Sequence, residues 1–172
     1  MQASGRTANL TVVTFRSVNA PGTADYDPGL QRHHLLPCQL LSQRCFGRMF
    51  ADVGRARIGF DDFRYNGLLM PSTEGASLRT GMPLHRGPHH RYNEVVIARV
   101  GRIEAQWSLA RRRNDEDALG EALFRLHLLQ GALRRQLLAQ RRRVVLNRRD
   151  PLGTGFDFSE LDAMAEALWM AE

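Results

Sequence analysis

Residues 30 to 37 read LQRHHLLP, and this segment predicts a short β-strand that ends at Pro37. Successive side chains of a strand point to opposite faces, so His33 and His34 are expected on different sides. Two neighbouring imidazoles in that arrangement cannot bind one ion side by side unless the backbone distorts. The pair is therefore expected to divide its roles, and the pattern alone leaves open which histidine takes which role.

The residues around this segment predict a second strand and a helix. Tyr65 to Pro71 (YNGLLMP) contain an Asn-Gly turn before a short apolar stretch. Cys38 to Val53 have apolar residues at helical spacing, whereas residues 72 to 84 are expected to form a loop. Leu10 to Phe15 (LTVVTF) have strand character.

Two long helices are predicted in the second half of the chain. The first covers about Gly87 to Arg113 and the second about Asp115 to Arg143, each with apolar residues at helical spacing. Ser159 and Asp162 resemble a capping box at the start of a last helix, Glu160 to Met170. The chain is therefore expected to belong to the α+β class, mostly helical, with a small core and long C-terminal helices.

Charge divides the chain into two parts. Residues 1 to 149 hold all 24 arginines and 12 of the 18 acidic residues, a net charge of +12. Residues 150 to 172 hold the other 6 acidic residues and no arginine, a net charge of −6. Because 172 residues suit one domain with an appendage, we expect a single domain over 1–149 and an acidic helical tail over 150–172.

The basic residues are all arginine, since the chain has no lysine. The planar arginine fork suits phosphate oxygens, so this composition favours nucleic acid as a partner. A coding bias towards arginine explains the missing lysines equally well.

The two cysteines and the N-terminus indicate the compartment. Cys38 and Cys45 would lie about 10 Å apart on a helix, beyond disulfide reach, and are expected to be core thiols. The absence of a CxxC pair argues against a cysteine zinc site. No apolar run reaches the length of a membrane span and no signal peptide begins the chain, so a cytoplasmic location without a membrane partner is expected.

Histidines supply the candidate site. The segment LHRGPHHRYNEVV has His85 four residues before His89 and Asn93 four residues after it. Positions four apart share a helix face, so His89 and Asn93 can point at one divalent ion, with His85 reaching it from the preceding segment. A metal or catalytic role is favoured for these histidines together with His33 and His34, because neutral imidazole is the commonest metal ligand.

The neighbours of this group have weaker assignments. On a helix His90 is rotated about 100° from His89, so it is expected at a phosphate or in solvent. Arg86 and Arg91 are candidate phosphate contacts or ordinary solvated arginines. The isolated His127 is expected to be structural.

Three blocks of the sequence resemble the AHH nucleases, a branch of the HNH/endonuclease VII superfamily. They are HHLLP at 33 to 37, GRARIGFDDFRYNGLLMP at 54 to 71 and LHRGPHHRYN at 84 to 93. The resemblance implies a ββα-metal nuclease core over about 30–107, with a helical extension over 108–149. Because such domains are common in bacterial toxins, it also implies delivery into a target cell and an immunity or inhibitor protein as partner.

The resemblance implies a metal-dependent endonuclease and a role for each matched residue. His33 would be a metal ligand and His34 the general base that activates water. Asn66 would brace the hairpin, and His85 and His89 would occupy the remaining histidine positions. The expected cofactor is one divalent ion (Mg, Mn, Ni or Zn), and the expected substrate is nucleic acid, with DNA favoured.

Two other classes of protein fit part of the pattern. In a non-catalytic nucleic-acid-binding module the histidines would hold a structural zinc, which takes four protein ligands, whereas a catalytic site keeps one position open to water. Asn93 is a poor ligand for structural zinc, so catalysis is favoured. In an interaction protein, Asp115 to Arg143 would form a partner or homodimer helix, which leaves the paired histidines without a role.

Overall fold

The computed structural model describes most of the chain. The described residues are 11–87, 89–139, 146 and 150–152. The predicted tail helix, Glu160–Met170, lies outside them. None of the helices in these ranges combines the length and the apolar character that a bilayer crossing requires.

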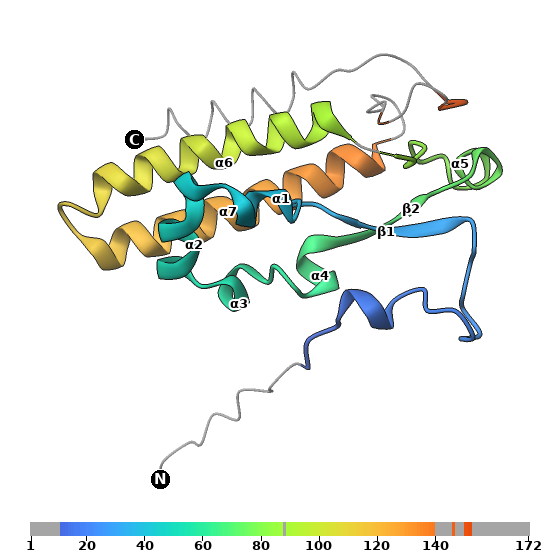
Figure 1. Cartoon of the computed structure of the whole chain (residues 1–172), viewed down its shortest axis with the longest axis horizontal. Coiled ribbons are helices and arrows are strands. Elements are labelled where there is room, and N and C mark those ends of the chain that lie inside the picture. The colour runs from blue at the N-terminus through green and yellow to red at the C-terminus, as the bar shows by residue number, and fades with distance from the viewer. Residues whose placement is uncertain (1–10, 88, 140–145, 147–149, 153–172) are drawn as a thin grey trace, which may run out of the picture.

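The two predicted strands pair as a small antiparallel sheet. β1 (Leu30–His34) runs beside β2 (Gly67–Pro71), with Leu30 opposite Pro71 and His34 opposite Gly67 (Figure 1). A short helix, α4 (Phe63–Asn66), leads directly into β2. Asp62 begins α4, because its carboxylate accepts a hydrogen bond from the backbone N–H of Arg64.

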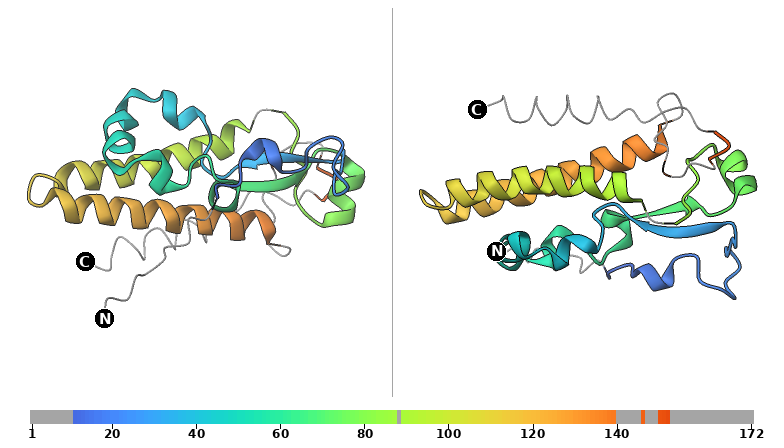
Figure 2. Two further views of the ribbon diagram at one scale, coloured as in Figure 1. Left: turned by 90° about the horizontal axis from the view of Figure 1, so that it is seen from below. Right: turned by 45° about the horizontal axis from the view of Figure 1, so that its top comes forward.

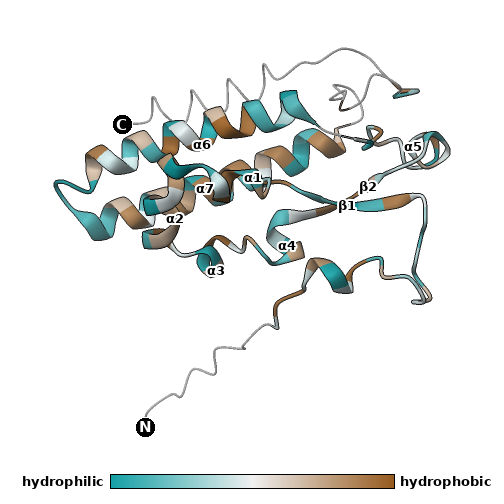
Figure 3. Ribbon diagram, in the orientation of Figure 1, coloured by the Kyte–Doolittle hydropathy of each residue, from teal (hydrophilic) through white to brown (hydrophobic). Residues whose placement is uncertain are grey.

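Two long antiparallel helices, α6 (His90–Ala110) and α7 (Asp115–Leu138), form the larger layer of the fold (Figure 1). Asn114 begins α7, because its side-chain oxygen accepts hydrogen bonds from the N–H groups of Glu116 and Asp117. Hydrophobic and hydrophilic bands alternate along both helices (Figure 3), as expected for helices with one buried face. Both predicted helices are present, but the second ends at Leu138 rather than near Arg143, because the backbone of Ala139 is extended with ψ 123°.

Short helical pieces pack against this layer. Where one continuous helix was predicted over Cys38 to Val53, the chain forms α1 (Gln39–Ser42), η2 (Arg44–Phe46) and α2 (Gly47–Val53), and α3 (Arg55–Ile58) follows them. The chain breaks at Gln43, whose backbone is extended with ψ 112°. Met49 and Val53 are buried as expected, but Cys38 and Cys45 are exposed free thiols. The prediction of core thiols is wrong, because the break at Gln43 ends the helical phase that would have carried Cys45 inward.

The segment 72–84, expected to be a loop, contains α5 (Glu74–Thr80). Thr73 Oγ1 accepts a hydrogen bond from the Ala76 N–H at 3.2 Å, and this bond begins the helix. Gly81 ends it with a left-handed backbone, φ 68°. These are ordinary start and stop signals of a helix, so the loop prediction is wrong here.

The N-terminal described segment forms η1 (Phe15–Ser17) instead of the predicted strand. Within the predicted strand, Thr14 forms an isolated antiparallel β-bridge with Asp62. A guanidinium nitrogen of Arg32, in β1, donates to the backbone oxygen of Phe15 at 2.9 Å. The segment is thereby held against β1.

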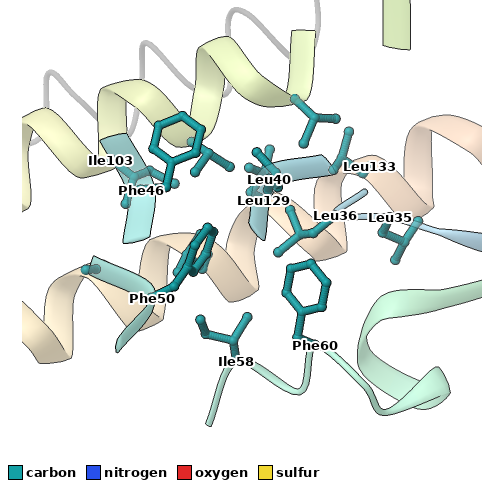
Figure 4. Close-up of a cluster of buried hydrophobic side chains, with 14 of the residues drawn as sticks. Leu35, Leu36, Leu40, Phe46, Phe50, Ile58, Phe60, Ile103, Leu129 and Leu133 are labelled. Atoms are coloured by element: carbon teal, nitrogen blue, oxygen red, sulfur yellow. The ribbon is translucent and has the colours of Figure 1, made fainter. Parts of the chain in front are cut away.

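One hydrophobic core lies between the helical pair and the short helices (Figure 4). The right-hand view of Figure 2 shows these two layers, with α6 and α7 on one side and the sheet and short helices on the other. Leu35 and Leu36, which directly follow His34, are completely buried in this core. The end of β1 is therefore anchored by its neighbours, and the α+β class expected from the sequence is confirmed.

Candidate metal centre and active site

Three histidines from separate segments meet beside the sheet and form the histidine cluster, His33, His85 and His89. His33 lies in β1, His85 between α5 and α6, and His89 directly before α6. Each can offer one ring nitrogen, and these three atoms lie within 4.8 Å of one another. The group is therefore compatible with one metal ion, and imidazole nitrogens bind zinc, for example, at about 2.0–2.1 Å.

Hydrogen bonds to both strands hold the cluster in place. The backbone N–H of His85 donates to the oxygen of Pro71, at the end of β2, at 2.7 Å. His85 Nε2 lies 2.8 Å from His33 Nδ1. The side-chain amide of Gln31 contacts both the backbone oxygen and Nδ1 of His85. β1 therefore supplies one member of the cluster and a second residue that orients another member.

Burial keeps the cluster uncharged near neutral pH. His33 is 5 % exposed and His85 is 9 % exposed. Desolvation lowers the pKa of His33 well below its usual range, and the neighbouring imidazoles lower it further. Burial likewise lowers the pKa of His85 to about 3, with His89 adding to the shift. The pKa of His89 is lowered by burial as well, although the Leu146 carbonyl, 3.4 Å from its Nδ1, opposes this shift.

The donor atoms of the cluster suit a metal ion. Nε2 of His33 is buried and has no hydrogen-bond partner among the described residues. Unsatisfied buried polar atoms are uncommon in native proteins and call for an explanation such as a bound ion. Neutral imidazoles suit Zn, Ni and other transition metals. The three residues therefore fit a divalent ion.

His34 lies on the other side of β1 in different surroundings. Its ring stacks on Phe15, with the ring centroids 3.7 Å apart and the planes 8° from parallel. Phe15 meets Phe63 edge to face at 5.1 Å, and Phe63 fills the space that a side chain at Gly67 would need. Burial lowers the pKa of His34, and the negative charge of Asp61 opposes that shift. The predicted separation of the paired histidines is confirmed.

Asn66 braces the chain where β1 ends. The residue is completely buried, and its Oδ1 accepts a hydrogen bond from the Leu36 N–H at 2.7 Å. Its Nδ2 donates to the backbone oxygens of Leu36 at 3.1 Å and Phe60 at 3.0 Å. Its own backbone oxygen accepts from the Leu35 N–H at 2.8 Å. These bonds position the two residues directly after His34.

Tyr92 of α6 supports the cluster from the core side. Its ring lies edge to face with the His33 ring, with centroids 5.0 Å apart. Its hydroxyl donates to the Leu35 oxygen at 2.8 Å, and burial raises the pKa of the phenol. The tyrosine therefore stays protonated and fixes β1 against α6.

The other predicted site residues lie around the start of α6. Asn93, expected as a ligand, donates from Nδ2 to Oε1 of Gln39 in α1 at 3.2 Å. Arg86, His90 and Arg91 are exposed in the same region. The metal-binding role of Asn93 and the phosphate contacts of the other three residues stay predictions.

Two residues of the site were not predicted. Gln31 could have been predicted from the sequence, because it precedes His33 by two positions and alternate residues of a strand lie on one face. Phe15 could not, because its contact with His34 joins two segments that no local sequence pattern relates.

The comparison with known families agrees with this geometry. A model of the AHH family, a nuclease family of the HNH/endonuclease VII superfamily with conserved AHH, matches residues 14–129. The chain belongs to this family. Where the motif has alanine, this AHH family member has Arg32, the residue that bonds to the Phe15 oxygen. No curated protein and no solved structure matches the chain.

Membership of the AHH family gives the site a context. The family is a nuclease family, so nucleic acid is the class of substrate it implies. The histidine cluster is compatible with metal binding. The matched residues 14–129 include the whole cluster, His34 and Asn66.

Proposed function

We propose that this AHH family member is a metal-dependent endonuclease that hydrolyses phosphodiester bonds, with DNA favoured as substrate. The observation that carries the proposal is the histidine cluster, three uncharged imidazoles on one side of β1, next to a fourth imidazole on the other side. Phosphodiester hydrolysis needs a nucleophilic water, stabilised charge on the phosphoryl oxygens and help for the leaving 3′ oxygen. The two sides of β1 suit these separate tasks.

His34 is the proposed general base. Because its pKa is lowered by burial, the ring is neutral near pH 7 and can accept a proton from the attacking water. The stack on Phe15 restricts the plane of the ring. The bonds of Asn66 to the backbone of Leu36 hold the chain that follows, so the base is positioned by packing as well as by hydrogen bonds.

His33, His85 and His89 are the proposed ligands of one divalent ion, Mg²⁺, Mn²⁺, Ni²⁺ or Zn²⁺. A divalent ion supplies Lewis-acid stabilisation of the phosphoryl oxygens and of the departing oxygen. Gln31 orients His85 through its ring and backbone contacts, as residues behind metal ligands commonly do. Asn93 is a further proposed ligand through its side-chain oxygen, while its Nδ2 donates to Gln39.

The start of α6 is the proposed phosphate face. The first backbone N–H groups of a helix lack partners within the helix and favour anions, and this helix start adjoins the cluster through His89. Arg86, His90 and Arg91 are exposed there. Arginine suits phosphate oxygens because its planar fork can donate two parallel hydrogen bonds.

The competing function is a non-catalytic nucleic-acid-binding module with a structural zinc. A structural zinc takes four protein ligands, whereas the cluster among the described residues supplies three histidines. Three ligands with an open position are typical of catalytic sites, which favours the nuclease.

Plasmid cleavage separates these two functions. Supercoiled DNA is incubated with the protein and Mg²⁺, Mn²⁺, Ni²⁺ or Zn²⁺, each with and without chelator. An endonuclease converts the plasmid to nicked and linear forms with at least one of the ions, and chelator stops the reaction. A protein that binds the plasmid and leaves it intact with every ion is the binding module instead. Replacing the plasmid with RNA tests the preference for DNA.

A further inference from the structure

A groove of about 600 Å³ lies beside α3 and α4 and is not part of the site described above. We name it the Tyr65 groove. Its walls come from α3, from the turn before α4, from Tyr65 and from His127 of α7. The groove therefore lies where the nuclease core meets the helical extension.

Tyr65 is an exposed aromatic ring that the fold nevertheless holds in place. The residue is 50 % exposed. Its side chain lies directly on the backbone of Gly59, where an added Cβ would come within 2.8–2.9 Å of it. Arg134 donates to the Tyr65 backbone oxygen at 3.3 Å, and the His127 ring lies 6.2 Å away at 25° from parallel. A planar ligand that stacks on Tyr65 would thus meet a preorganised surface, which lowers the entropy cost of binding.

His127 is fixed in the same wall. Its Nε2 lies 3.1 Å from the backbone oxygen of Arg57, which ties α7 to α3. The sequence indicated only a structural role for this histidine. The structure adds that its ring is nearly parallel to Tyr65 and borders the groove.

The charges of the groove suit an anion. Both of its carboxylates are paired with arginines, Asp61 with Arg55 at 2.8 Å and Asp62 with Arg64 at 2.6 Å. Arg57 is exposed, and no carboxylate of the described residues lies within ion-pair distance of it. The groove therefore offers a cation beside an aromatic ring.

One edge of the groove is linked to the proposed general base through the N-terminal described segment. Val12, on this edge, belongs to the segment whose Phe15 stacks on His34. A strand cut beside His34 would pass over this edge.

We propose that the Tyr65 groove binds an unpaired nucleotide of the substrate strand, with the base stacked on Tyr65 and the phosphate paired with Arg57. The proposal rests on the proposed function, because it assumes a nucleic-acid substrate. Aromatic rings beside arginines are the usual means by which proteins bind single-stranded nucleic acid without reading its sequence. The groove accordingly favours single-stranded segments and accepts any base.

Binding of a labelled single-stranded oligonucleotide, measured by fluorescence anisotropy in chelator, tests the groove without activity as readout. Tyr65→Ala is expected to weaken binding by about fivefold or more, the lower range for loss of one stacking ring. Tyr65→Phe retains the ring and binds like the parent. Arg57→Gln weakens binding and reduces its salt dependence, because one phosphate contact is lost. Tyr26→Ala is the matched control, since Tyr26 is 40 % exposed and lies outside the groove.

Three other results would each contradict a different part of the proposal. Equal affinity of Tyr65→Ala and its parent removes the groove as a binding site, and the nuclease proposal still stands if His34→Ala stops cleavage. Equal losses for a blunt duplex and for the single strand overturn the stacked base. A parent protein that binds neither DNA nor RNA in chelator, and cleaves neither with any of the four ions, overturns the nuclease function itself. Circular dichroism of each variant checks that the fold is intact.

Discussion

The two faces of β1 have different surroundings, although His33 and His34, which lie on them, are adjacent in the sequence. On one side His33 is buried among two further imidazoles and a tyrosine, and its pKa is far below the usual range. On the other side His34 is partly exposed and stacks on Phe15, and the negative charge of Asp61 opposes the lowering of its pKa by burial. Because successive side chains of a strand point to opposite faces, two adjacent histidines supply a buried candidate ligand on one face and an accessible candidate base on the other.

This difference separates two requirements that oppose each other. A metal ligand benefits from a fixed, buried ring that does not bind protons, whereas a general base must exchange protons with water. If both rings shared one face, the ion would compete with the proton for the base. The predictions below test how strictly the two sides are divided.

The largest effect is expected for His34→Ala. Loss of the general base should lower cleavage by about 10² to 10⁴-fold, while metal affinity stays near that of the parent because the cluster is on the other side of β1. Single-turnover cleavage and titration calorimetry measure the two quantities. Near-normal turnover would remove His34 from the reaction, and loss of metal binding would mean that the two sides are not separate.

Stability without metal should fall in acid. The folded state lowers the pKa of His33 and His85 below the unfolded value of about 6.5, so the unfolded chain binds more protons as the pH falls through that value. Each of these two histidines then costs up to about 1.4 kcal/mol of unfolding free energy per pH unit below about 6.5, and the stabilisation is fully present above it. Urea unfolding in chelator between pH 7.5 and 5.5 measures this loss. A flat profile would contradict the burial of uncharged imidazoles.

His89→Ala should weaken metal binding and cleavage together. Loss of a residue behind a ligand commonly costs about 10 to 100-fold in affinity, so loss of the ligand itself should cost at least about tenfold. Titration calorimetry measures the affinity, with His34→Ala as the control from the opposite side. Unchanged metal binding in His89→Ala would mean that the ion lies elsewhere.

The smallest effect is expected for Gln31→Ala. Without the amide, His85 loses a contact to its ring and another to its backbone, and metal affinity should fall by about tenfold, the lower end of the range for a residue behind a ligand. Thermal unfolding in chelator shows whether the fold is retained. If the affinity does not change, Gln31 takes no part in orienting the ligand.

The sequence predicted those features that depend on local periodicity. The strand of LQRHHLLP, the strand after Asn66 and the two long helices follow from spacing alone, and all are present. The opposite orientation of His33 and His34 follows from the same rule. The meeting of His33 with His85 and His89 needed the family resemblance, because spacing relates only residues within one element.

The errors of prediction come from interactions that cross between elements or from caps that were overlooked. The break at Gln43 turns Cys45 to the surface, and no residue type in that stretch forbids a continuous helix. The helix α5 was missed although Thr73 and Gly81 cap it in the ordinary way. The stack of Phe15 on His34 depends on how the N-terminal segment crosses β1, which only the assembled fold determines.

The contact between His33 and His85 joins positions 52 residues apart in the chain. An ion bound to both would act as a removable crosslink, because it closes a loop whose ends the unfolded chain keeps apart through its entropy. By mass action, anything that binds only the folded state raises the ratio of folded to unfolded molecules as its free concentration rises above its dissociation constant. The concentration of free metal in the cell would then govern how many of these molecules stay folded long enough to escape proteolysis.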